Sequence, residues 1–342
     1  MTGADAGRVR VAVTLEDGRV AGVQVASDRP AAARVFVGQP PERVAAVLPL
    51  LFSLCGKAQG AASRYAIAAA RGMPLPPGLD AEVAREAMAE HLWRLLMDEG
   101  DPEARRACVE GRQKLADRSA FAAWFAGAAG LAPGAAAELA DVRKAAGWLG
   151  AGSLLARRAS SLPATAGMTD PVPVLPVTVG AASLELAPAL DAAFARQPEW
   201  RGHPAQTGPL ARQPAFATAE WADRAFLGRW LARLVELAEF AAGPGIFPGG
   251  PGQVAAVAVA PGRGRATVET ARGLLMHEVT LREGLVQDYV IVAPTEWNFH
   301  PGGALQAWLL GREAASAEAV RGFVADAIAA LDPCVEWELL VA

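Results

Sequence analysis

The chain has 342 residues, a formal charge of −4 from 32 Lys and Arg against 36 Asp and Glu, and three cysteines. Hydrophobic residues make up 52% and charged residues 20%, so the chain can bury a sizeable core, which excludes wholesale disorder. The slight negative charge excludes the basic footprint of a nucleic-acid-binding protein. Three cysteines are too few for a secreted disulfide framework, so we expect a reducing compartment, the cytoplasm.

No segment is expected to cross a membrane. The first ten residues lack the apolar stretch of a signal peptide. The two long uncharged runs, residues 119–137 and 240–262, both contain proline, which would interrupt a helix crossing about 20 residues' worth of hydrocarbon.

Residues 1–75 are predicted to hold a β-hairpin followed by helices. Valines alternate with other residues over 8–26 on both sides of Asp17-Gly18, a pair typical of a hairpin turn. From residue 42 the apolar spacing becomes helical, and Pro49 is expected to kink or restart that helix. A second, alanine-rich helix is expected at about residues 59–70.

Residues 76–250 are predicted to be mostly helical. Asp80 is expected to cap one helix, and Asp101-Pro102 supplies the N-cap and first residue of the next, whose apolar face carries Cys108 as a core residue. The segment 217–242 has the strongest long helical stripe. Two stretches without helical period are expected to be irregular, residues 160–178 and the Gly/Pro-rich residues 243–252.

Residues 251–342 are predicted to return to strands. The strands expected are 254–259 and 267–281, the latter paired across residues 282–284 with 286–292. A final amphipathic helix is expected at 312–331, and it ends at Asp332-Pro333-Cys334. The fold class is therefore predicted to be α+β, with β-rich ends packed around a central helical bundle in one intertwined unit.

Cys55 and Cys334 both lie where a helical pattern begins or ends, and Gly56 follows the first of them. A thiolate at such a position suits metal binding or thiol chemistry. On spacing alone the alternative is two buried structural cysteines. Neither belongs to a CxxC pair, so the sequence signals neither a zinc site nor a redox dithiol.

Four stretches, in order, resemble the metal-binding motifs of nickel-iron hydrogenase large subunits. The resemblance covers about residues 9–75 and 254–340. The stretches are RVFVG (34–38) followed by LFSLCGKAQ (51–59), ETARGLLMH (269–277), VAPTEWN (292–298) and DPC (332–334).

The departures from this family concern the metal ligands. In the enzymes each cysteine motif is CxxC, whereas here the second positions are Ala58 and Trp337, and the histidines that close the motifs become Ala62 and Leu340. Two thiolates cannot both bridge and terminate a nickel–iron pair, so we expect neither nickel nor hydrogen turnover. Trp337 is expected to fill the space of a bridging ligand.

The motif residues that this chain retains would surround an iron that carries cyanide and carbon monoxide. The resemblance implies that Cys55 and Cys334 are its metal ligands and that Arg272, Pro294 and Thr295 hold the cyanides. A guanidinium is a permanent donor for the strong acceptor that such a cyanide provides. The ordinary alternative is that Arg272 is an ion-pair partner and that Pro294 and Thr295 only end a strand.

Cysteine-poor relatives of this kind are the hydrogenase expression/formation proteins of the HupK/HoxV type, and the LFSLCGKAQ stretch is more similar to that branch than to the enzymes. The resemblance implies a non-enzymatic scaffold that transiently holds Fe(CN)2(CO) before transfer into the large subunit. Its implied partners are the accessory proteins that build and deliver the iron fragment, and the large subunit itself. Two alternatives stay open: a divergent subunit that oxidises hydrogen, and a metal-free structural partner of hydrogenase assembly.

The histidines carry no separate site. His277 and His300 are expected to be satisfied or exposed rather than ligands or bases, and His91, on an apolar helix stripe, is expected to belong to the core.

Overall fold

The structure is a computed structural model, and it describes residues 7–28, 32–97, 101–132, 148, 152–165, 172–178, 180–243 and 253–342. The irregular stretches predicted at 160–178 and 243–252 fall partly outside these ranges. Where 161–165 and 172–178 are described, they form neither a helix nor a strand of the sheets.

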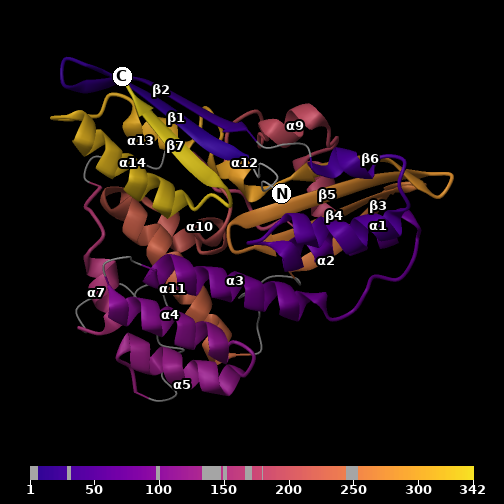
Figure 1. Ribbon diagram of the computed structural model, residues 1–342, viewed down its shortest axis with the longest axis horizontal. Coiled ribbons are helices and arrows are strands. Elements are labelled where there is room, and N and C mark those ends of the chain that lie inside the picture. The colour runs from indigo at the N-terminus through magenta and orange to yellow at the C-terminus, as the bar shows by residue number, and fades with distance from the viewer. Residues whose placement is uncertain are drawn as a thin grey trace, which may run out of the picture.

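The predicted N-terminal hairpin is confirmed. Strands β1 (Arg8–Glu16) and β2 (Arg19–Asp28) pair antiparallel, and the turn residues Asp17 and Gly18 both have positive φ. A strand that the sequence did not predict, β7 (Glu336–Val341), pairs parallel with β1 and completes a three-stranded sheet in the order β2-β1-β7. Strands β1 and β7, from opposite ends of the sequence, therefore lie side by side (Figure 1).

Two helices from the end of the chain cover the valine-rich face of this sheet. They are α13 (Ala304–Leu309) and α14 (Ala317–Leu331), and their apolar side chains form one core with the valines of β1 and β2. Helix α14 begins later than predicted, because Ser316 caps it by accepting the Ala319 N–H. It ends at Asp332, which has a left-handed φ of 58°.

The second sheet is an antiparallel meander of four strands. They are β3 (Val254–Ala260), β4 (Arg263–Thr270), β5 (Gly273–Arg282) and β6 (Leu285–Val292), in that order. The prediction of one strand over 267–281 was wrong, because Gly273 has a φ of 124°, a conformation that other residues rarely adopt, and the chain turns there. Arg272 therefore lies in the β4–β5 turn.

The N-terminal helices lie against this meander. The order is η1 (Ala32–Phe36), α1 (Pro41–Val47), η2 (Leu48–Leu51) and α2 (Gly56–Ala70). The predicted restart at Pro49 is confirmed, since α1 ends at Val47 and a separate 3-10 turn follows. Buried alanines of α2 contact the sheet, as their small size permits.

Gly264 sets how closely α2 approaches the sheet. A Cβ at this position would lie 2.2 Å from the Ala66 carbonyl oxygen and 2.3 Å from the Ala70 nitrogen. Only glycine therefore lets the helix backbone rest directly on β4. This contact fixes α2, and with it the position of Cys55 at the start of that helix.

The middle of the chain is mainly helical, as predicted, and its longer helices form the lower part of the molecule in Figure 1. Asp101 is the N-cap of α4, with Pro102 at the first position, as predicted, and Cys108 is buried in the helical core. The longer helices are α3 (Leu79–Leu96), α4 (Pro102–Lys114), α5 (Arg118–Ala129), α7 (Leu154–Ser160) and α11 (Ala225–Ala242). The shorter ones are α8 (Ala182–Leu186), α9 (Ala192–Arg196) and α10 (Pro209–Arg212). A further short helix, α12 (Pro294–Asn298), lies outside the middle and follows β6.

Two predictions in this region were wrong in detail. Asp80 does not cap α3, because Gly78 is the N-cap and the Asp80 carboxylate instead accepts the Val254 N–H. The helix expected over 217–242 begins at Ala225, because the 3-10 turns η4 (Pro214–Ala217) and η5 (Ala219–Arg224) precede it.

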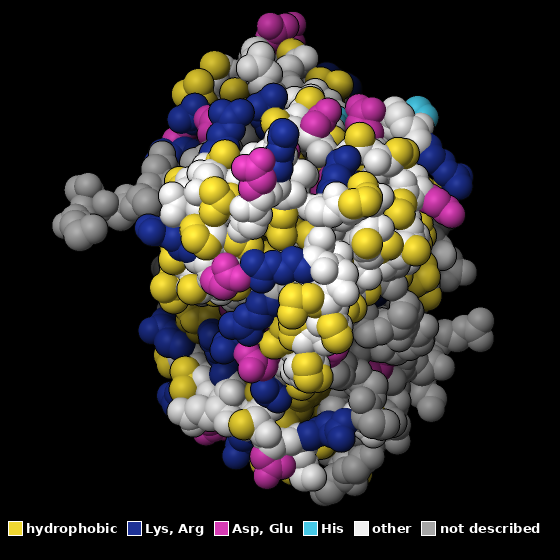
Figure 2. Space-filling model, turned by 90° about the vertical axis from the view of Figure 1, so that its right-hand side faces the viewer, with side chains coloured by type: hydrophobic (Ala, Val, Ile, Leu, Met, Phe, Trp, Pro, Cys, Tyr) yellow, Lys and Arg dark blue, Asp and Glu magenta, His cyan; other side chains and the backbone are white. Residues whose placement is uncertain are grey.

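Among the described helices, none has the length and apolar composition needed to cross a lipid bilayer. Figure 2 shows one end of the molecule, where hydrophobic side chains lie in separate groups among Lys, Arg, Asp and Glu side chains.

Candidate metal centre

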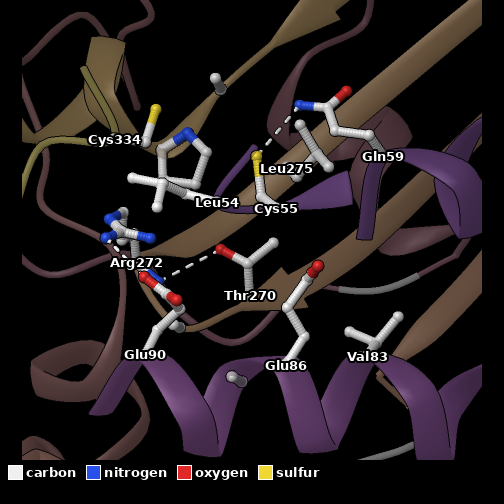
Figure 3. Close-up of a pocket in the computed structure, with 14 residues that line it drawn as sticks. Leu54, Cys55, Gln59, Val83, Glu86, Glu90, Thr270, Arg272, Leu275 and Cys334 are labelled. Atoms are coloured by element: carbon white, nitrogen blue, oxygen red, sulfur yellow. Dashed lines mark hydrogen bonds and ion pairs between the residues drawn. The ribbon is translucent and has the colours of Figure 1, made fainter. Parts of the chain in front are cut away.

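One pocket brings together the residues that the sequence singled out. Cys55, Arg272, Pro294 and Cys334 all line it, although they come from four separate segments of the chain. In Figure 3, Glu86 and Glu90 rise from α3 on one side, and the two cysteines lie on the other. Both cysteines are partly buried and neither forms a disulfide.

Cys55 occupies the N-cap position of α2. Its own side chain makes no capping hydrogen bond there; Glu86 of α3 provides the cap instead, by accepting the N–H groups of Lys57 (2.7 Å) and Ala58 (2.9 Å). A carboxylate at a helix N-terminus satisfies two orphan donors and complements the helix dipole. Burial raises the pKa of Glu86.

A chain of hydrogen bonds runs from Cys55 into the sheet. The Gln59 side-chain amide donates to the Cys55 sulfur (3.8 Å), and its oxygen lies 2.9 Å from Nε2 of His277. Nδ1 of His277 lies 2.9 Å from the Tyr289 hydroxyl. Burial lowers the pKa of His277 to about 3, so its ring is neutral, with the proton on Nε2 facing the amide oxygen.

Cys334 is held by Thr295. The threonine hydroxyl lies 3.1 Å from the cysteine sulfur, and its oxygen accepts the Cys334 backbone N–H at 3.3 Å. Thr295 itself is 1% exposed and does not line the pocket, whereas its neighbour Pro294 does. The threonine therefore acts on the pocket through the cysteine.

Arg272 ties the pocket to α3 and to the end of α14. Its guanidinium donates to the carboxylates of Glu90 (3.1 Å) and Asp332 (3.4 Å), and Asp332 also accepts from Arg94. Burial alone would raise the pKa of Asp332, but Arg272, Arg94 and Arg233 outweigh it and lower that pKa to about 2. Arg272 is thus an ion-pair partner in the structure, as the ordinary alternative expected. Its buried Nε has no hydrogen-bond partner among the described residues.

The rest of the pocket wall is largely apolar. Carboxylates enter it only from α3, as Glu86 and Glu90, and among the described residues no three His, Cys, Asp or Glu side chains are grouped to hold a metal ion. Besides these carboxylates, the polar groups of the pocket are two thiols, one guanidinium and the side chains of Gln59 and Thr270. The apolar members are Leu54, Val83, Ala87, Ala271, Leu275, Ala293 and Pro294.

Sequence reasoning missed the residues that support the pocket. Glu86 and Glu90 lie four positions apart on α3, beside its apolar stripe. Two acidic side chains next to buried positions are unusual, and this signal in the sequence could have identified them as site residues. Asp332 was read only as part of a motif, and nothing local in the sequence indicates that it pairs with Arg94, which is 238 positions away.

The expectation for Trp337 was wrong. Its side chain is 40% exposed on β7, where it pairs with Val9, and it is not among the residues that line the pocket. The strand β7 carries it away because the chain turns out of the pocket directly after Cys334. Ala58 and Ala62 are fully buried in α2.

His277 and His91 behave as expected. His277 is buried and satisfied, and His91 is in the core, where Nε2 lies 2.6 Å from a Glu236 carboxylate oxygen. The expectation for His300 was wrong in part, because it is buried and only its Nδ1 is satisfied, by the Gly302 N–H, whereas its Nε2 has no hydrogen-bond partner among the described residues. None of the three lines the pocket.

The chain is similar to curated hydrogenase expression/formation proteins over nearly its whole length. It is 33% identical over 368 residues to HoxV of Cupriavidus necator, covering 95% of this chain and 94% of that protein. It is 31% identical over 359 residues to HupK of Azotobacter vinelandii, covering 98% and 99%. No model of a protein family matches the chain.

The fold is that of nickel-iron-selenium hydrogenase large subunits, which confirms the predicted large-subunit-like α+β class. The chain superposes on the reduced, active enzyme from Desulfomicrobium baculatum with a TM-score of 0.57, over 94% of this chain and 95% of that one, at 14% identity. For the oxidised enzyme from D. vulgaris Hildenborough the TM-score is 0.56, over 93% and 94%, at 15% identity. Identities this low establish the shared fold alone, whereas the near-full-length matches above 30% establish the family. The chain belongs to the HupK/HoxV family of hydrogenase expression/formation proteins.

Proposed function

We propose that this protein serves in the maturation of nickel-iron hydrogenase as a scaffold that transiently holds an iron carrying cyanide and carbon monoxide. Two findings support this: its relatives are named hydrogenase expression/formation proteins, and its pocket collects two thiols and a buried arginine. The observation that carries the proposal is the convergence of Cys55, Cys334 and Arg272 on one pocket from distant parts of the chain.

The chemistry of the pocket suits such a fragment. Thiolates are soft ligands that favour iron, and the two cysteines would bind it while leaving other coordination positions for a donor protein. The Arg272 guanidinium, which lines the pocket, would donate to a cyanide nitrogen. Pro294 would present an apolar surface to the diatomic ligands, and Thr295 would orient the Cys334 sulfur.

The same pocket disfavours a resident nickel–iron centre. The third cysteine, Cys108, lies in the helical core, so only two thiols are offered to the pocket. Incomplete coordination would keep binding reversible, as a relay requires, and the protein would have no catalytic residues of its own. Its partners would be the cytoplasmic accessory proteins that build and deliver the iron fragment, and the hydrogenase large subunit.

Infrared spectroscopy tests this proposal on protein purified without oxygen from its own host. We expect carbon monoxide and cyanide stretching bands together with iron at less than one atom per chain. Elemental analysis is expected to find no nickel, and hydrogen is expected to reduce no dye. Absence of the bands and of iron would contradict the scaffold, whereas nickel with dye reduction would favour a divergent hydrogen-oxidising subunit.

Host strains separate the scaffold from a metal-free structural partner. We expect replacement of Cys55 or Cys334 by serine to lower the hydrogenase activity of the host, because the iron fragment would lose a ligand. Unchanged hydrogenase activity in both strains, with normal amounts of the variant proteins, would favour the metal-free partner.

A further inference from the structure

Arg272 lines a second pocket, which is rich in arginine. Arg229 and Arg233 of α11 line it as well, together with the amides Gln206 and Asn298. Among the residues that line it, all of them in described parts of the chain, none is Asp or Glu. The others are Thr207, Pro209, Leu210, Ala330 and Leu331.

Arg233 is buried without a carboxylate partner. Its guanidinium donates to the carbonyl oxygens of Arg229 (3.2 Å) and Ala330 (2.8 Å), and no ion pair to it is found within the described residues. The residue is only 4% exposed, and its buried Nε has no hydrogen-bond acceptor among the described residues. Burial lowers the pKa of Arg233 to about 10, against the attraction of Asp332, so its charge is only partly compensated.

Positive charge is in excess around this pocket. Asp332 and Glu90, which do not line it, are both already engaged by Arg272, and Arg94 also pairs with Asp332. Glu236, on the same helix as Arg233, is engaged by Arg212 and His91. Buried charge of one sign without a counter-charge is costly. The guanidinium groups that act on Asp332 are Arg94, Arg233 and Arg272, and the charge of Arg229 acts on Arg233.

The amides of the pocket are already in use as acceptors. The Gln206 side-chain oxygen accepts from Arg229, and the Asn298 side-chain oxygen accepts the Thr207 N–H at 2.9 Å. The groups left without partners are therefore donors, the Nε–H of Arg233 and that of Arg272. A ligand that satisfies them must offer acceptors, and a negative charge would offset the excess of arginine.

We propose that this pocket binds a small oxyanion, held between Arg233 and Arg272. A planar oxyanion such as formate or bicarbonate, and a tetrahedral oxyanion such as phosphate, share the oxygen acceptors that guanidinium groups recognise. The site shares Arg272 with the cysteine pocket but contains no cysteine and does not depend on iron, so it can be present in a protein that binds no metal.

Thermal unfolding of the metal-free full-length chain tests the site. Titrations with formate, bicarbonate and phosphate, in a chloride buffer of constant ionic strength, separate the planar from the tetrahedral class. We expect a saturating rise of Tm with one class, because a ligand that binds only the folded state stabilises it. Arg233→Gln is expected to weaken binding about tenfold, the size of one lost charge-assisted hydrogen bond.

The matched control is Arg157→Gln, which removes an exposed arginine paired with Glu103 elsewhere on the surface and should leave the affinity unchanged. No saturable shift with any oxyanion, or equal affinity in Arg233→Gln, would overturn the site. If Arg233→Gln does not fold, the position of the bound anion can be determined by soaking selenate into crystals of the unaltered protein. Anomalous density between Arg233 and Arg272 supports the site, and its absence there contradicts it.

Discussion

The hydroxyl oxygen of Thr295 lies 3.1 Å from the sulfur of Cys334 and also accepts that residue's backbone N–H at 3.3 Å. The first turn of α12 thus holds the cysteine that follows α14, although the two residues are 39 positions apart. This contact places one thiol at the edge of the pocket whose other thiol is Cys55.

Replacing Thr295 by valine removes the hydroxyl but keeps the shape of the side chain. We expect a loss of about 1 kcal/mol in the free energy of unfolding, because the Cys334 N–H loses its acceptor, and less iron retained in protein isolated from its host. Urea unfolding and iron analysis measure the two effects. Thr295→Ser is the matched control and should retain both properties; iron retention in Thr295→Val equal to that of the unaltered protein would contradict the role of the hydroxyl.

Arg272 is expected to be important for stability as well as for binding. Arg272→Met would leave the buried carboxylates of Glu90 and Asp332 short of a partner, at a cost of about 3–5 kcal/mol in the free energy of unfolding. Adding Glu90→Gln removes one of those charges and should restore part of the loss. Urea denaturation of both variants measures this, and a double variant no more stable than the single one would speak against the pairing.

Acid should weaken the fold through Asp332. Its pKa is about 2 in the folded chain against 3.8 for a free carboxyl. Because the folded pKa is the lower one, the stabilisation is complete above pH 4 and is lost as the pH falls through 2, by about 2 kcal/mol. In Asp332→Asn we expect a smaller fall in the free energy of unfolding between pH 5 and pH 3. An identical pH dependence in the two proteins would refute this assignment.

The packing of α2 on β4 should tolerate no side chain at Gly264. Gly264→Ala would push its Cβ into the helix backbone, at a cost on the order of 3 kcal/mol, and would displace Cys55 with the helix. Gly127→Ala in α5 is the matched control: nothing lies within 4 Å of the added methyl group, so a gain of about 0.5–1 kcal/mol is expected. Thermal unfolding compares the two, and a Gly264→Ala variant as stable as the unaltered chain would contradict the close approach.

Elements with local signals were predictable from the sequence. The hairpin at Asp17-Gly18, the cap at Asp101 and the restart at Pro49 all depend on residues within a few positions of each other. The break between β4 and β5 was missed because Arg272-Gly273 was read as part of a motif within a strand, whereas Gly273 supplies the unusual backbone angle.

Elements that depend on distant partners were not predictable in this way. Strand β7 is defined by pairing with β1 at the opposite end of the chain, which no local pattern reveals. The residues of the family motifs Cys55, Arg272, Pro294 and Cys334 do line one pocket, but the contacts that Glu86, Glu90 and Asp332 make with this site are visible only in three dimensions.

The most direct test of the iron-holding pocket compares three cysteine variants by infrared spectroscopy. Cys55→Ala, Cys334→Ala and the control Cys108→Ala each remove one sulfur, and only the first two come from the pocket. In protein purified without oxygen from the host, we predict carbon monoxide and cyanide bands in the unaltered protein and in Cys108→Ala. We predict that they are lost in both pocket variants. Bands of full intensity in Cys55→Ala and Cys334→Ala would contradict the proposed site.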